Sequence, residues 1–148
     1  MPNDFNNFVE RLQKNIREKE LESYSEKILG LFYNPKNWGK PLSEEITAYE
    51  EQRKGPKNYL LGIYLKIEND IITKANFITD GCGVMVATGS QTTILIEGRS
   101  IEFAVKLKPE DIIKALSGLP NDEIYCAEMA IEILQNIIQK YNNTKKLS

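Results

Sequence analysis

The spacing of hydrophobic and polar residues predicts an amphipathic helix at the start of the chain. Between Asp4 and about Glu22, charged residues separate apolar residues that recur at helical intervals: Phe5, Phe8, Val9, Leu12 and Ile16. Residues three and four positions apart share one face of a helix. We expect this apolar face to pack on the rest of the protein; the alternative is that it binds a partner.

Short runs of apolar and β-branched residues predict three strands. Residues 59–67 and 71–78 form two such runs, and Glu68-Asn69-Asp70 between them has the composition of a tight hairpin turn. Residues 43–54 are ambiguous, because their acidic residues would also suit an exposed helix. We favour a strand there that pairs with residues 59–67 across a turn at residues 54–58. The three strands would form a small antiparallel meander with one face to be covered.

Helical patterns occupy much of the remaining chain. Residues 23–26 offer N-cap side chains for a helix through Tyr33, and two prolines and a glycine within residues 34–41 end it. A second helix is expected to begin near Gly83, where small residues are followed by apolar ones.

Later helices are predicted by their start and stop signals. Gly98 ends one helix and Ser100 caps a short helix over residues 101–105. Pro109 suits the first turn of the next helix. The last helix begins near Ile124, and we expect residues 142–148 to form a frayed polar tail. The predicted fold class is therefore α+β, with a small antiparallel sheet of about three strands packed against helices.

Composition is typical of an ordinary globular protein. The 148 residues predict an N-terminal helix over residues 1–23, one domain over residues 24–141 and the polar tail, without further domains. A net charge of −2 gives no indication of nucleic-acid or membrane binding. No apolar run has membrane-spanning length, and the N-terminus lacks the basic start of a secretory signal, so we expect a cytoplasmic protein.

The chain has two cysteines and no histidine. Two cysteines do not make a disulfide scaffold, which fits a reducing compartment. The lack of histidine excludes Ser-His-Asp triads, Cys-His nucleophile pairs and His-ligated zinc. Any metal binding or nucleophilic chemistry must use thiolate, carboxylate, lysine, tyrosine or backbone groups.

Cys82 lies where a strand is predicted to end and a helix to begin, within Thr79-Asp80-Gly81-Cys82-Gly83. We expect Gly81 and Gly83 to give the backbone its geometry there. Unpaired N–H groups at a helix start would stabilise a thiolate, which can bind metal or attack sulfur. The alternative is that Cys82 is a small apolar residue filling a turn.

Four separated stretches resemble the iron–sulfur cluster assembly scaffolds of the IscU family and the N-terminal domain of NifU. They stand in the family's order: Tyr24-Ser25-Glu26-Lys27 with Asn34-Pro35-Lys36-Asn37-Trp38-Gly39; Phe77-Ile78-Thr79-Asp80-Gly81-Cys82-Gly83; Gly98-Arg99-Ser100-Ile101-Glu102-Phe103-Ala104 with Leu119-Pro120; and Ile124-Tyr125-Cys126-Ala127. The resemblance covers roughly residues 24–141. It implies a NifU/IscU-like fold, in which the loops that carry the cysteines meet at one end of the sheet.

The resemblance also implies a ligand set that this chain has only in part. The family's site has three cysteines and an aspartate, commonly with a histidine before the third cysteine. Cys82 matches the second cysteine and Cys126 the third. Lys57 or Asn58 replaces the first cysteine, and Tyr59 or Leu60 replaces the aspartate.

Tyr125 stands in place of the histidine. Asp80, Tyr59 and Tyr125 are candidate auxiliary ligands. Lys57 is a candidate partner for a thiolate, although a loop lysine facing water is the alternative.

Three hypotheses follow for the two thiols. In the first, the chain is a scaffold or carrier, not an enzyme, whose Cys82 and Cys126 bind a [2Fe–2S] cluster, iron or persulfide sulfur, with zinc as a weaker candidate. A cysteine desulfurase and cluster-recipient proteins are the implied partners, and a second copy could supply missing ligands. In the second, the chain has lost the cluster and serves as a protein-binding or regulatory module. In the third, the thiols form a redox-sensing disulfide.

Overall fold

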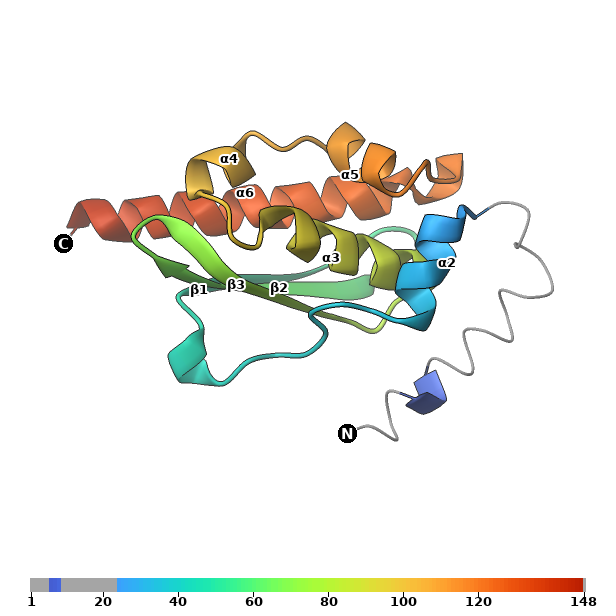
Figure 1. The fold of residues 1–148 in the computed structure, drawn as a ribbon, viewed down its shortest axis with the longest axis horizontal. Helices are drawn as coiled ribbons and strands as arrows, with labels where there is room; N and C mark the ends of the chain where they lie inside the picture. The colour runs from blue at the N-terminus through green and yellow to red at the C-terminus, as the bar shows by residue number, and fades with distance from the viewer. Residues whose placement is uncertain (1–5, 9–23, 148) are drawn as a thin grey trace.

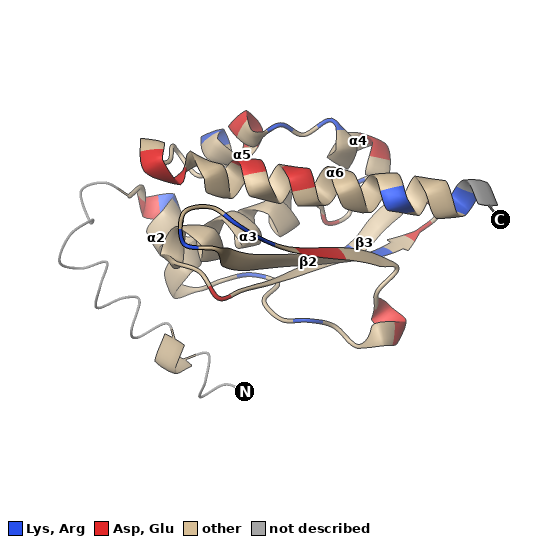
Figure 2. Ribbon diagram, turned by 180° about the vertical axis from the view of Figure 1, so that it is seen from behind, with Lys and Arg blue, Asp and Glu red and all other residues tan. Residues whose placement is uncertain are grey.

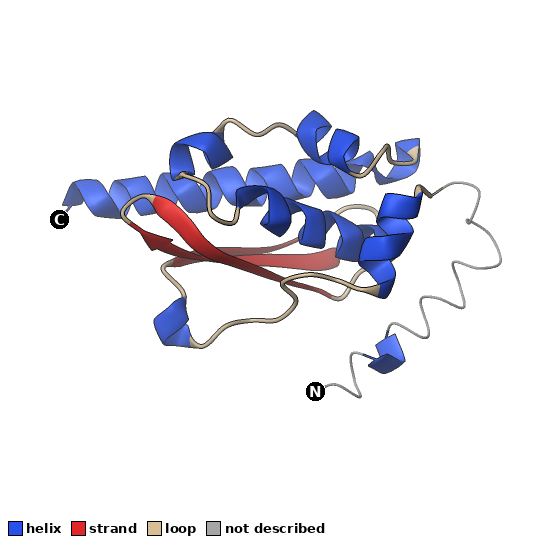
Figure 3. Cartoon of the chain, viewed as in Figure 1, coloured by secondary structure: helices blue, strands red, loops and turns tan. Residues whose placement is uncertain are grey.

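A three-stranded antiparallel sheet carries helices on one face (Figures 1 and 3). The computed structural model describes residues 6–8 and 24–147. Its elements are, in order, α2 (Glu26–Tyr33), η1 (Ser43–Glu45), β1 (Ala48–Lys54), β2 (Tyr59–Glu68), β3 (Ile71–Thr79), α3 (Gly83–Ile96), α4 (Ile101–Val105), α5 (Pro109–Ala115), η2 (Asn121–Glu123) and α6 (Ile124–Leu147). The strand order β1-β2-β3 confirms the predicted α+β meander.

The two hairpins form where the sequence places turn residues. Asn69 and Asp70 both have positive φ, at 54° and 62°, as the twisted two-residue turns between antiparallel strands require. Gly55, with a φ of 85°, lies in the turn between β1 and β2. The strand prediction for residues 43–54 is right only for its second half. Residues 43–45 form the 3₁₀ turn η1, and β1 begins at Ala48.

Side chains of β2 are buried on both faces of the sheet. Leu61, Ile63 and Leu65 alternate along β2 and are completely buried in the core. Tyr64 points to the opposite face, where its ring stacks on Tyr49 and its hydroxyl donates a hydrogen bond to Glu51. The segment between α2 and β1 passes on this side of the sheet, as Figure 1 shows.

Helix α3 lies at the centre of the molecule and is buried on nearly every side. Its close approach to the sheet depends on Gly89, because a Cβ atom there would lie 2.3 Å from Cδ2 of Phe77 in β3. Other buried positions of α3 carry the small hydroxyl side chains of serine and threonine. Thr92 and Thr93 donate hydrogen bonds to carbonyls of the preceding turn, so their burial leaves these hydroxyls satisfied.

The segment after α2 is fixed against both α3 and β3. The Lys36 backbone N–H donates to Ser90 Oγ at 3.1 Å, and the Asn37 side chain donates to Thr93 Oγ1 at 3.1 Å. Trp38 forms a parallel bridge with Phe77, and their rings meet edge to face at 5.3 Å. This part of the predicted family signature therefore has a structural role.

Little of the predicted N-terminal helix falls within the described residues. Residues 6–8 are helical, and the Phe8 ring stacks on Trp38 with 6.3 Å between ring centroids. This contact agrees with the expectation that the apolar face packs on the domain. The rest of the segment predicted from Asp4 to Glu22 lies outside the described residues.

Helix α6 is longer than predicted, and the expectation of a frayed tail from residue 142 is wrong as far as Leu147. Asp70, in the β2–β3 turn, accepts hydrogen bonds from the Tyr141 hydroxyl at 3.0 Å and from Lys145 Nζ at 2.6 Å. These contacts anchor the last turns. Figure 2 shows acidic residues in the first half of α6 and basic residues near its end, where positive charge complements the helix dipole.

Among the described residues, no helix has both the length and the apolar character that crossing a bilayer requires.

The contact between Gly89 and Phe77 gives the first testable prediction. We expect Gly89→Ala to lower the free energy of unfolding by about 1–3 kcal/mol, because the added methyl group overlaps the buried ring. This loss should occur although alanine is favoured over glycine inside helices by about 1 kcal/mol. Urea unfolding followed by circular dichroism measures it.

Gly30→Ala in α2 is the matched control. A Cβ at Gly30 meets no atom within 4 Å, so alanine should raise the stability by up to about 1 kcal/mol. Equal responses at the two positions would contradict the packing described for α3.

Candidate functional site

Cys82 is the N-cap residue of α3 and lies three residues after the end of β3 at Thr79. Its side chain is partly exposed. Gly81 and Gly83 do not have positive φ, so neither residue is in the left-handed region that favours glycine. Gly81 allows a close approach, since a Cβ there would lie 3.0 Å from Cγ of Tyr59. The Tyr59 ring thus packs over the cysteine loop.

Cys126 lies in the first turn of α6 and is completely buried. Its side chain lies beside that of Cys82, close enough for each sulfur to influence the pKa of the other. The two helices bring the sulfurs together because α3 packs on α6 and both helices begin at the same end of the sheet (Figure 1). Neither cysteine is part of a disulfide bond.

The surroundings of the two sulfurs favour one thiolate and one thiol. The hydrogen bond from Cys126 is the main cause that lowers the pKa of Cys82 from 9.0 to about 6, against the opposing effect of burial. The Cys82 side chain makes no capping hydrogen bond of regular geometry, but the backbone N–H groups of Met85 and Val84 further lower its pKa. The same hydrogen bond, burial and the nearby Cys82 charge raise the pKa of Cys126. Cys126 therefore donates a proton toward the Cys82 sulfur.

Tyr125 lies beside both sulfurs. Its hydroxyl is hydrogen-bonded to the Cys126 side chain, and burial together with the two cysteines raises the pKa of the phenol. Its ring packs against the β1–β2 turn, where a Cβ at Gly55 would lie 2.4 Å from the ring. Tyr125 thus connects the turn, the start of α6 and the thiol pair.

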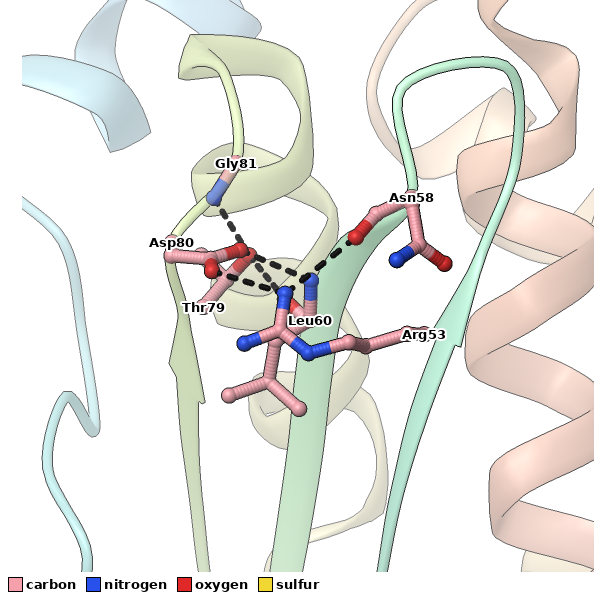
Figure 4. Close-up of polar contacts among 6 residues, drawn as sticks. All are labelled: Arg53, Asn58, Leu60, Thr79, Asp80 and Gly81. Atoms are coloured by element: carbon pink, nitrogen blue, oxygen red, sulfur yellow. Dashed lines mark hydrogen bonds and ion pairs between the residues drawn. The ribbon is translucent and has the colours of Figure 1, made fainter.

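Asp80 lies two residues before Cys82 in the sequence, but its carboxylate binds other groups of the protein (Figure 4). Its carboxylate accepts from the Leu60 backbone N–H at 2.7 Å and from Arg53 Nη1 at 3.0 Å. The same Arg53 nitrogen donates to the Asn58 carbonyl at 3.2 Å. Arg53 and Asp80 form a clamp that ties the β1–β2 turn to the cysteine loop.

Sequence reasoning did not identify Arg53. It stands 27 residues before Asp80, and only the pairing of β1 with β2 and of β2 with β3 brings the two together. Lys57 is exposed in the β1–β2 turn. The influences that lower the pKa of Cys82 come from Cys126 and from backbone groups.

The site offers two thiol ligands and a neighbouring phenol. Among residues 6–8 and 24–147, no group of three or more cysteine, aspartate or glutamate side chains is arranged to hold a metal ion. A [2Fe–2S] cluster takes four ligands and structural zinc also takes four. The two cysteines of one chain therefore supply two of the four ligands that a cluster or a zinc ion takes. A polarised thiolate next to a thiol is, by itself, sufficient for nucleophilic chemistry at sulfur.

Comparison with known proteins identifies a family for the whole domain. The sequence profile of the family described as "NifU-like N terminal domain" matches residues 23–148. The iron–sulfur cluster assembly scaffold protein IscU 1 of Archaeoglobus fulgidus is 32% identical over 118 residues, which are 80% of this chain and 76% of that protein. The scaffold protein IscU of Aquifex aeolicus is 33% identical over 120 residues, 80% of this chain and 75% of that protein.

A solved structure shows the same fold. It is that of a putative iron–sulfur cluster assembly scaffold protein for the SUF system from Fervidobacterium islandicum. It superposes with a TM-score of 0.63 at 16% identity and covers 78% of this chain and 96% of that protein. The resemblance stated from four short motifs is confirmed for the family and for the fold.

The hydrogen bond between the sulfurs predicts how Cys82 reacts with an alkylating agent. Because the thiolate is the nucleophile, the iodoacetamide rate at Cys82 should rise with pH through a midpoint near 6 rather than near 9. We expect Cys126→Ala to move this midpoint to higher pH, since it removes the main cause of the lowered pKa. Mass spectrometry after timed alkylation measures both rates.

Asp80→Asn is the matched control for this experiment, because it alters the same loop without touching the sulfur pair. Its midpoint should stay close to that of the wild type. A midpoint for Cys126→Ala that equals that of the wild type would contradict the contact between the sulfurs.

Proposed function

The chain belongs to the family of NifU-like N-terminal domains, and from this membership we propose that it is a scaffold-type protein of iron–sulfur cluster assembly. In this role it would bind sulfur, iron or a cluster and transfer it to another protein, rather than catalyse the conversion of a substrate. One observation carries the proposal: the two cysteines, 44 residues apart in the sequence, lie beside each other at the starts of α3 and α6, at the same end of the sheet.

The proposed cargo is sulfur, iron or a [2Fe–2S] cluster bound through Cys82 and Cys126. Thiolates are good ligands for iron and good acceptors of sulfane sulfur. Persulfide sulfur suits the site best, since it needs one nucleophilic thiolate and no further ligand.

Iron or a cluster needs additional ligands, from Tyr59, from Tyr125 or from a second copy of the chain. Asp80 is the weakest of the auxiliary candidates, because its oxygens already bind Arg53 and the Leu60 amide. Zinc, with two thiolates and only weak oxygen ligands available, would be held poorly.

The proposed partners follow from this role. A cysteine desulfurase would deliver sulfur to the partly exposed Cys82, and recipient proteins would take up the assembled cluster. Lys57 and the rest of the β1–β2 turn are exposed near this end of the molecule, where such a partner would approach. Two free thiols fit the reducing compartment expected from the cysteine count.

Anaerobic reconstitution tests the proposal. The reduced protein is incubated with ferrous iron, cysteine and a cysteine desulfurase, desalted, and assayed for bound iron and labile sulfide. We expect the wild type to retain iron together with labile sulfide, and Cys82→Ser to lose at least about nine tenths of the bound sulfur, because the acceptor thiolate is gone.

Gln135→Ala, at an exposed position of α6, is the matched control and should retain what the wild type retains. Retention of sulfur and iron by Cys82→Ser at the wild-type level would contradict the proposed function. So would a wild-type protein that binds neither.

A further inference from the structure

The two sulfurs differ sharply in their access to solvent. Cys82 is partly exposed at the start of α3, whereas Cys126 has no exposed surface and lies behind it. A sulfur donor can therefore reach Cys82 but not Cys126. The thiol beside Cys82 is that of Cys126, so a sulfur atom attached to Cys82 lies within reach of it.

We propose that Cys82 and Cys126 act together as a two-electron reductant that converts sulfane sulfur, received by Cys82 as a persulfide, into free sulfide. This inference rests on the proposed function, because it assumes that Cys82 accepts sulfur. It assigns a separate activity to the pair, since a carrier alone would hand on the sulfur in its sulfane state.

The chemistry balances in two steps. The Cys82 thiolate attacks the outer sulfur of a donor persulfide; the bond from that sulfur to the donor breaks, and the donor leaves as a thiolate. Cys126 then attacks the inner sulfur of the Cys82 persulfide, that is, Cys82 Sγ.

In this second step the Sγ–Sγ bond forms, the outer sulfur leaves as hydrosulfide, and the Cys126 proton goes to that leaving group. The two cysteines are oxidised to a disulfide while sulfane sulfur is reduced to sulfide. A low-molecular-weight thiol such as glutathione returns the pair to the reduced state by thiol–disulfide exchange.

The local geometry supports this division of roles. Cys126 is unsuited to bridging to a second copy of the chain, because it is fully buried. Within the described residues it also lacks a set of neighbours that would make it part of a complete metal site. Its neighbours are the Cys82 sulfur and the side chain of Tyr125, which lies close enough to both cysteines to be influenced by them. We infer that Tyr125 is a positioning residue for the second step.

Glutathione persulfide is the probe that tests the inference. Reduced wild-type protein is mixed with it anaerobically, and intact-protein mass and released sulfide are followed in time. We expect the wild type to lose two hydrogens as the disulfide forms and to release one sulfide per disulfide. In Cys126→Ala the mass of one added sulfur atom should persist on Cys82, and sulfide release should fall by at least about tenfold.

Two further variants separate chemistry from structure. Cys82→Ser should gain neither sulfur nor a disulfide, since Cys126 is inaccessible. Tyr125→Phe should form the Cys82 persulfide at the wild-type rate but convert it severalfold more slowly, a split that general loss of structure would not produce. Thermal unfolding of each variant checks that the fold is retained, and Cys126→Ser replaces Cys126→Ala if the latter unfolds.

The outcomes distinguish this inference from the proposed function. A wild-type persulfide on Cys82 that persists without disulfide or sulfide would overturn the inference and leave the carrier role intact. Release of sulfide by Cys126→Ala and Cys126→Ser as fast as by the wild type would overturn it in the same way. A wild-type protein that takes up no sulfur at all would contradict both proposals.

Discussion

The position of the thiol pair depends on the burial of α3 between the sheet and the other helices. This helix can approach the sheet closely because Gly89 presents no side chain to the Phe77 ring. Phe77 is held in turn by Trp38, whose segment is hydrogen-bonded to α3. Interiors are packed so densely that a helix enclosed on all sides has little freedom to shift. The first turn of α3, and Cys82 with it, is therefore fixed relative to α6 and Cys126.

The chemistry of the site follows from placing one thiol at a helix start and a second thiol behind it. Backbone N–H groups and the neighbouring thiol stabilise negative charge on Cys82, while burial and that charge keep Cys126 protonated. Such an unequal pair is well suited to accept sulfur at one atom and to resolve it at the other. It is poorly suited to enclose a cluster, because four ligands are needed and the chain contributes two cysteines.

Contacts between side chains stabilise the loops around the thiol pair without metal. The Arg53–Asp80 clamp joins the β1–β2 turn to the cysteine loop, and the Tyr125 ring fills the space beside Gly55 (Figure 4). The ion pair is half exposed and contributes only about 0–1 kcal/mol. Its effect is to restrict how the loops are arranged more than to stabilise the fold.

The sequence by itself determined the three strands, the hairpin turns, the helix caps and the family, because each of these depends on local patterns of apolar, capping and turn residues. It also predicted Cys82 and Cys126 as the residues of the candidate site. It did not show that Arg53 meets Asp80, that Tyr125 reaches Cys126, or that α6 extends to Leu147 through contacts with Asp70. These depend on side chains from distant segments, and only the packing of the helices on the sheet decides which of them meet. The same packing gives the two cysteines unequal exposure, because one lies at the rim of the core and the other inside it.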